Sequence, residues 1–311
     1  MKKSKSGVVF TPVATAVEPR PRAYSRIVAK GPKKIFLFSV AKIKTPKSEY
    51  AMSAVNIDIS AGICTITLNR PEQRNALNVP MLNQLNEAIQ GASTDTSVRC
   101  LVITGSGRGF CAGADLAEWA EAEANGSLES YGWTESAHLL MQSIESFPKP
   151  SVAVVNGAAV GAGLDMALSC DFRIALESAK FIAGYTSMAY TPDAGGSWLL
   201  PRLIGVEAAK QFLFFDKPWS AQLAKSKGMV TECLAADDFE TETKNFITQL
   251  ASGPTFAHAK TKQLLQMSSQ NSLSQQLKLE HQAGLECGRS KDAAEALQAS
   301  IEKRPANFCG R

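Results

Sequence analysis

The chain has 311 residues, of which 45% are hydrophobic and 20% charged, enough for one substantial core with a smaller part appended to it. No segment approaches the eighteen uncharged apolar residues that a membrane-spanning helix needs, so we expect no membrane partner. Residues 1–52 carry twelve Lys or Arg and two acids, which leaves residues 53–311 with a net charge of −6 despite the formal total of +4. We therefore expect no nucleic-acid surface on the folded part.

The first segment, residues 1–52, has five prolines among scattered basic residues and no helical or strand period. This pattern predicts a disordered basic extension. It suits either an organellar transit peptide or a start site assigned too early, with Met52 as the later start. The predicted location is accordingly cytoplasmic, or the mitochondrial matrix if the segment is a transit peptide.

From Val55 onward, apolar residues alternate with polar ones on both sides of an Ala-Gly turn, which predicts a β-hairpin. Helices and buried strands then alternate, which predicts an α/β core built from parallel crossovers. The predicted helices are centred on 81–89, 136–147 and 164–170, and the predicted strands cover 100–104, 151–156 and 172–175.

After about Ser220 no strand pattern recurs, and the predicted elements are the helices 220–227, 237–251, 255–268, 272–287 and 291–302. The expected organisation is a core at 53–219 and a helical C-terminal subdomain at 220–311.

The seven cysteines are widely spaced and never form a C-x-x-C pair, and the three histidines are never four residues apart. These spacings predict reduced thiols and no metal site.

Two predicted strands run into glycine-rich bends, VITGSGRGFCAGADL at 102–116 and VVNGAAVGAGLDM at 154–166. Glycine permits tight turns, and free N–H groups at a helix start attract negative charge, so the two bends can hold one oxyanion between them. A dinucleotide or P-loop site is excluded by the spacing, and no G-x-S-x-G serine elbow occurs. Ordinary tight turns between strands and helices are the simpler alternative.

Five linked motifs resemble those of the crotonase superfamily, the enoyl-CoA hydratase/isomerase family: LNRPEQRNALN (68–78), GFCAGADL (109–116), KPSVAVVNGAAVGAGLDMALSCDFRIA (149–175), PDAGGSWLLPRLIG (192–205) and EKRPANF (302–308). The resemblance implies a spiral core of ββα units and a helical C-terminal region that forms a homotrimer or a dimer of trimers. It also implies an acyl-CoA thioester as substrate. Coenzyme A is then part of the substrate, and no separate cofactor is expected.

By the same resemblance, the backbone N–H groups of Ala114 and Ala162 form the oxyanion hole. Fixed donors aimed at a thioester oxygen stabilise the enolate that forms when a neighbouring carbon loses its proton. The residues implied to contact the substrate are Asn75, Ala76, Asp115, Leu116, Gly161 and Lys303. Lys303 is expected at the CoA phosphates, with Arg74 as an alternative.

Hydratases of this family use two glutamates, and this chain has Asp165 and Tyr185 in their places. Asp193 stands where isomerases of the family carry an acid, so the site pattern is closest to the isomerase branch. A single carboxylate can remove a proton from one carbon and return it to another. We predict Asp193 as that acid and base, Asp165 as an assisting group and Tyr185 as part of the acyl pocket. Helix capping remains the alternative role for either aspartate.

Three other functions stay open. One is enoyl-CoA hydration. The second is an aroyl-CoA dehalogenase reaction, in which Asp193 attacks an aryl carbon and His138 assists hydrolysis of the resulting ester. The third is a non-catalytic RNA-binding or scaffolding role, for which the basic extension is the only support.

Overall fold

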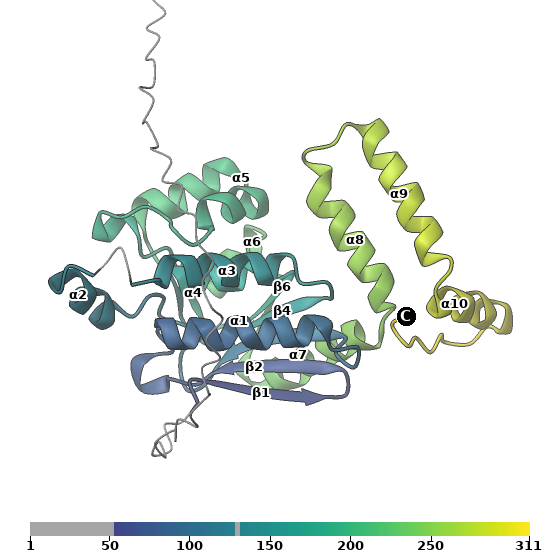
Figure 1. Ribbon diagram of the computed structural model, residues 1–311, viewed down its shortest axis with the longest axis horizontal. Helices are drawn as coiled ribbons and strands as arrows, with labels where there is room; N and C mark the ends of the chain where they lie inside the picture. The colour runs from purple at the N-terminus through teal and green to yellow at the C-terminus, as the bar shows by residue number, and fades with distance from the viewer. Residues whose placement is uncertain (1–52, 128–130) are drawn as a thin grey trace, which may run out of the picture. The chain divides into compact units, whose positions relative to one another are not determined.

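The structure, a computed structural model, describes residues 53–127 and 131–311 (Figure 1). One compact unit of the chain extends from Ala51 to Arg311, close to the predicted start at residue 53. The predicted disordered extension lies outside the described residues. No helix in the described part is long and apolar enough to cross a membrane.

The main sheet has six strands in the order β1-β2-β3-β4-β6-β9. The predicted hairpin is present, because β1 and β2 pair antiparallel around a turn in which Ala61 and Gly62 both have positive φ. Every later pairing in this sheet is parallel. The strands are β1 (Val55–Ser60), β2 (Ile63–Leu68), β3 (Cys100–Gly105), β4 (Ser151–Val155), β6 (Phe172–Leu176) and β9 (Glu232–Leu234).

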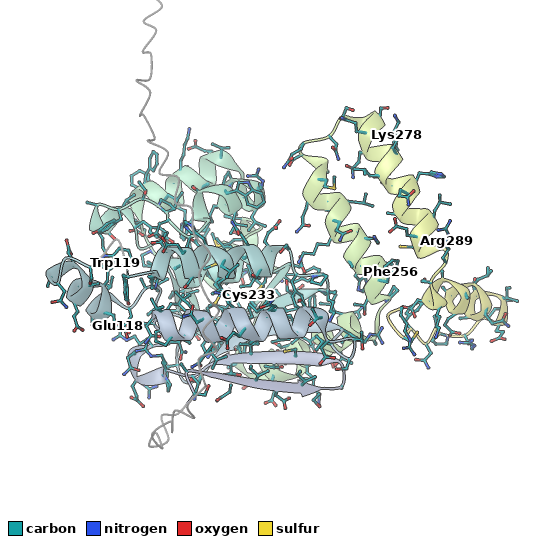
Figure 2. All side chains as sticks on the ribbon, viewed as in Figure 1. Glu118, Trp119, Cys233, Phe256, Lys278 and Arg289 are labelled. Atoms are coloured by element: carbon teal, nitrogen blue, oxygen red, sulfur yellow. The ribbon has the colours of Figure 1, made fainter. Side chains whose placement is uncertain are left out.

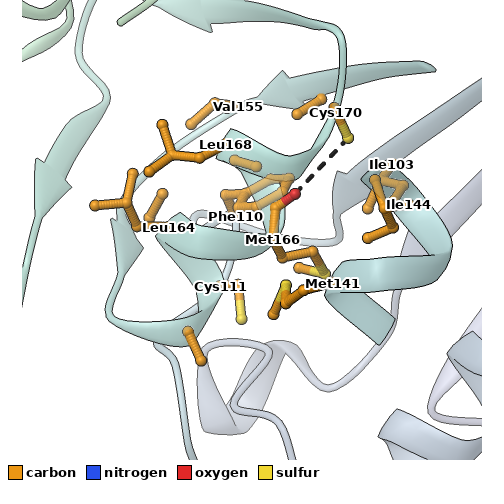
Figure 3. Close-up of a cluster of buried hydrophobic side chains, with 14 of the residues drawn as sticks. Ile103, Phe110, Cys111, Met141, Ile144, Val155, Leu164, Met166, Leu168 and Cys170 are labelled. Carbon is orange, nitrogen blue, oxygen red and sulfur yellow. Dashed lines mark hydrogen bonds between the residues drawn. The ribbon is translucent and has the colours of Figure 1, made fainter. Parts of the chain in front are cut away.

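Helices α1 (Val79–Thr94) and α3 (Trp133–Glu145) pack side by side over this sheet (Figure 1). Both bury one apolar face, as the sequence period predicts. Helix α4 (Ala162–Ser169) is buried along its whole length. Figure 3 shows its apolar side chains packed with residues of β3 and α3, so the helix that starts at the second glycine-rich bend is anchored in the core.

A second, small sheet consists of β5 (Ala159–Val160), β7 (Lys180–Ile182) and β8 (Trp219–Ser220). Between β7 and β8 lie η3 (Thr186–Met188) and α5 (Gly196–Phe215), which is interrupted at Gly205 with φ 77° and ψ 158°. These short strands, η1 (Pro71–Gln73) and α2 (Leu116–Ala124) were not predicted, because such short segments carry too little periodicity.

The predicted C-terminal helices are confirmed within a few residues. They are α6 (Ala221–Ser226), α7 (Ala236–Ser252), α8 (Thr255–Ser268), α9 (Leu273–Cys287) and α10 (Lys291–Glu302). Serine side chains cap the N-termini of α6, α9 and α10, which fixes where they begin. The prediction that only helices follow Ser220 is wrong at β9, which pairs with β6 and extends the main sheet.

Candidate active site

Direct backbone contacts join the two glycine-rich bends. The N–H groups of Phe110 and Cys111 both donate to the carbonyl of Ala158 at 3.1 Å, and Val160 N–H donates to the carbonyl of Cys111 at 3.0 Å. A Cβ atom on Gly163 would lie 2.6 Å from the Cys111 Sγ. Glycine is therefore required at this position for the bends to approach so closely.

The two predicted oxyanion donors remain unpaired in this arrangement. Leu77 N–H donates to the Gly113 carbonyl at 2.7 Å and Asp115 N–H donates to the Leu77 carbonyl at 3.1 Å, which leaves the intervening Ala114 N–H free. Ala162 is the first residue of α4, where a helix has no partner for its own N–H groups. Neither N–H has a hydrogen-bond partner in the described parts of the chain.

The bends lie close enough for one oxygen to reach both donors. A Cβ atom added to Gly113, the neighbour of Ala114, would lie 3.5 Å from the Ala162 nitrogen. A pocket of about 350 Å³ opens here, lined among others by Ala114, Leu116, Gly161, Ala162, Tyr185 and Asp193. Six of the twelve residues predicted for the site are thus brought together.

Asp193 lies between η3 and the start of α5 and is exposed in the single chain. Partial burial of its carboxyl group raises its pKa, and the nearby His138 opposes that rise to a smaller extent. The predicted proximity of His138 is present: its Nε2 lies 2.7 Å from the main-chain oxygen of Asp193. Gly195, without any side-chain cap, is the N-cap of α5. Asp193 therefore does not cap α5 and instead lines the pocket.

Asp165 and Tyr185 form a buried pair behind the pocket. Asp165 is completely buried, and its Oδ2 accepts a hydrogen bond from the Tyr185 hydroxyl at 2.5 Å. Its Oδ1 has no partner in the described parts of the chain that meets hydrogen-bond geometry, although Gly196 approaches it closely. Burial raises the pKa of Asp165 to about 7, while the bond from Tyr185 and the Gly196 N–H lower it less.

This geometry changes the predicted role of Asp165. Tyr185 lines the pocket, whereas Asp165 is fully buried and does not line it. Burial also raises the pKa of Tyr185, so its hydroxyl stays protonated and donates to Asp165. Asp165 is connected to the pocket lining through its hydrogen bond from Tyr185.

Asn75 and Ala76 lie beside the pocket rather than on its surface. The Asn75 side chain is fully buried, and its amide donates to the carbonyls of Ser106, Gly109 and Phe110 at 3.0–3.1 Å. It therefore holds the first glycine-rich bend in place. The backbone after it pairs with that bend through a bridge between Leu77 and Ala114. The expected contact of Asn75 and Ala76 with a substrate stays a prediction.

Asp115 has a structural partner that the sequence analysis missed. It caps α2 by accepting from the Ala117 N–H at 3.3 Å, and its Oδ2 forms an ion pair with Arg70 at 2.9 Å. Arg70 also donates to the Ala76 carbonyl at 2.6 Å, so it joins the two segments that flank the pocket. Its presence in the LNRPEQRNALN motif was the only signal available.

Lys303 is not brought to the pocket within this chain. It is the exposed C-cap residue of α10, with φ 53°. Helix α8, earlier in the C-terminal region, contacts the core away from the pocket. Lys262 forms an ion pair with Asp171 at 3.0 Å, and Gln266 donates a hydrogen bond to Glu145. The expected contact of Lys303 with a bound substrate therefore has no support in the single chain.

Aromatic side chains form another side of the pocket. Trp119 of α2 (Figure 2) meets Trp133 of α3 edge to face, with ring centroids 5.6 Å apart. Trp133 Nε1 donates to the Leu77 carbonyl at 2.7 Å, which fixes the ring. Tyr131 OH donates to Glu118 at 2.8 Å beside them. The described residues contain no group of three His, Cys, Asp or Glu arranged to hold a metal ion.

Known proteins show extensive similarity to this chain. The profile of the enoyl-CoA hydratase/isomerase family matches residues 58–311. A probable enoyl-CoA hydratase of Rhodobacter capsulatus is 40% identical over 83% of this chain and 98% of its own length. The 1,2-epoxyphenylacetyl-CoA isomerase of Escherichia coli is 35% identical over 81% of this chain and 97% of its own length.

Solved structures share the fold. A Pseudomonas aeruginosa protein matches 75% of this chain and 99% of its own chain, with 55% identity and a TM-score of 0.72. The predicted crotonase-type α/β fold with a helical C-terminal region is thereby confirmed. The names of the relatives include both hydratases and an isomerase, so they leave the reaction open.

Proposed function

The chain belongs to the enoyl-CoA hydratase/isomerase family, and we propose that it shifts a carbon–carbon double bond of an enoyl-CoA thioester. It is an enzyme of the crotonase superfamily. One observation carries the choice of reaction. Asp193 lines the pocket together with the two free N–H groups, whereas the other candidate acid, Asp165, is fully buried outside the pocket lining and accepts a hydrogen bond from Tyr185.

In the proposed reaction, the thioester oxygen lies between the Ala114 and Ala162 N–H groups. The Asp193 carboxylate removes a proton from the acyl chain, and the electrons move onto the thioester oxygen as an enolate. The two N–H groups stabilise this charge, usually the largest single contribution to such catalysis. The Asp193 carboxyl group, which is exposed and exchanges its proton with solvent, then donates a proton to a different carbon, and the double bond has moved. The raised pKa of Asp193 makes its carboxylate a stronger base for the removal of the proton.

Hydration fits the same pocket less well. It needs a water molecule held by two acids that activate it and protonate the product. Tyr185 occupies the place of one such acid, and its protonated hydroxyl already donates a hydrogen bond to Asp165. This leaves Asp193 without the partner that a two-acid hydration mechanism requires.

The position of His138 favours one alternative, an aroyl-CoA dehalogenase-like reaction. An Asp193 oxygen would attack a ring carbon and expel halide, and water activated by His138 would then hydrolyse the ester and restore the carboxylate. His138 lies next to Asp193, but its Nε2 contacts the main-chain oxygen rather than the carboxylate. We therefore place this function second.

Product analysis separates these reactions. The full chain is incubated with trans-2-, cis-3-, trans-3- and 3,5-dienoyl-CoA and with 4-halobenzoyl-CoA, and products are identified by mass and chromatography. We expect a product of unchanged mass with a relocated double bond. A product heavier by one water would establish hydration instead, and halide release would establish the second candidate.

We also propose a homotrimer or a dimer of trimers. Large apolar side chains are exposed on the C-terminal helices and α5, among them Phe214 and Phe215 at 71% and 69%. Where exposed apolar side chains form a contiguous patch, they mark a subunit interface. Light scattering of the purified chain should give three or six times the monomer mass, and a monomer would contradict this. A transit-peptide role for residues 1–52, with the matrix location it implies, stays a prediction, as does an RNA-binding role.

A further inference from the structure

We propose that the acyl pocket selects an uncharged, ring-bearing acyl group and rejects acyl groups that end in a carboxylate. This inference rests on the proposed function, because it concerns the acyl-CoA bound in the same pocket. It is carried by the side chains that line the pocket beyond the oxyanion donors.

The first observation is the apolar and aromatic character of these side chains. Leu116, Trp119 and Trp133 line one part of the pocket, and Met188 and Tyr190 line another. Aromatic side chains favour ring partners through stacked or edge-to-face contacts, which contribute about 0.5–1.5 kcal/mol beyond simple burial. The exposed Leu116, Met188 and Tyr190 are thus available to cover a bound ring.

The second observation is the charge of the pocket. The described residues that line the pocket include the acids Glu123 and Asp193 but no Lys, Arg or His. Glu123 lies on α2, one turn beyond Trp119. A carboxylate at the end of an acyl chain would meet like charge, and the described lining residues offer no cation to offset that repulsion.

The third observation is that several polar groups of the pocket are already committed. The Ser187 hydroxyl donates to Asp216 at 2.6 Å, Trp133 Nε1 donates to Leu77, and the Tyr185 hydroxyl donates to Asp165. The indole of Trp119 and the phenol of Tyr190 remain, and neither carries a charge. The side chains that the structure describes around the pocket therefore offer no built site for an anion beyond the oxyanion donors.

Binding of saturated thioesters tests this inference. Hexanoyl-CoA and adipoyl-CoA have acyl chains of equal length and differ in the terminal carboxylate, and 3-phenylpropanoyl-CoA adds a ring. Isothermal titration calorimetry should show adipoyl-CoA binding at least about tenfold more weakly than hexanoyl-CoA, which corresponds to about 1.4 kcal/mol. We expect 3-phenylpropanoyl-CoA to bind about threefold or more tightly than hexanoyl-CoA. Equal or tighter binding of adipoyl-CoA, or weaker binding of the ring, would overturn the inference.

A pair of variants on one helix assigns the effect. Glu123→Gln should reduce the difference between hexanoyl-CoA and adipoyl-CoA by about threefold or more, whereas Glu121→Gln, an exposed residue outside the pocket, should leave it unchanged. Equal effects of the two substitutions would contradict the role of Glu123. Because the saturated thioesters have no double bond to shift, these affinities do not depend on the reaction. If the expected affinities were found without turnover of any enoyl-CoA, only the proposed function would fail.

Discussion

The buried pair of Asp165 and Tyr185 makes the stability of the protein depend on pH in a predictable direction. Burial raises the pKa of Asp165 from 3.8 to about 7 in the folded state. Between these values the folded protein holds a proton on Asp165 that the unfolded chain has lost. The free energy of unfolding therefore falls as pH rises, by at most about 1.4 kcal/mol per pH unit, and levels off above the folded pKa. Between the two pKa values, the total fall in the free energy of unfolding is at most about 4 kcal/mol.

Asp165→Asn removes this titration while keeping nearly the same shape. Urea unfolding of both proteins at pH 5, 6, 7 and 8 gives their difference in free energy, from which carboxylates common to both largely cancel. We expect the wild type to lose stability relative to the variant between pH 5 and 7 and to change much less between pH 7 and 8. A difference that is constant across pH, or that moves in favour of the wild type, would refute the assignment of a raised pKa to Asp165.

Two substitutions test the backbone donors and the glycine that positions them. Ala162→Pro removes one donor at the first position of α4, where proline is tolerated, so turnover should fall about 10²–10³-fold with little change in melting temperature. Ala236→Pro, at the same position of exposed α7, should leave turnover unchanged, and equal losses would count against the oxyanion hole. Gly163→Ala places a methyl group against Cys111 and should destabilise the fold by about 1–3 kcal/mol, whereas Gly91→Ala, with free space around it, should not. Equal stability of these two glycine variants would show that the close approach of the bends is dispensable.

The fold was largely predictable where periodicity is strong. The hairpin alternates every second residue, and α1 and the C-terminal helices have clear apolar faces. Strand β9 was not predicted, because its three residues show no apolar period and its position is set by pairing with β6. Helix α2 escaped for a related reason, since its nine residues bury only Ala122.

The candidate site divides in the same way. Ala114, Ala162 and Asp193 lie in linear motifs, and the structure places all three at one pocket. The Arg70–Asp115 ion pair joins residues 45 positions apart, and the bond from Tyr185 to Asp165 joins residues 20 positions apart. Such contacts depend on tertiary structure, so no local sequence pattern predicts them. They are what turned Asp165 from an expected catalytic group into a buried partner of Tyr185.

The central claim is that Asp193 moves a proton between carbons of a thioester enolate. The most direct measurement is deuterium incorporation into an enoyl-CoA incubated in D₂O, followed by mass spectrometry, for the wild type and Asp193→Asn. Calorimetry with hexanoyl-CoA controls for binding. We expect the wild type to incorporate deuterium as the double bond moves, and the variant to be slower by about 10²–10⁴-fold with similar affinity. Incorporation by Asp193→Asn within tenfold of the wild-type rate would contradict the account.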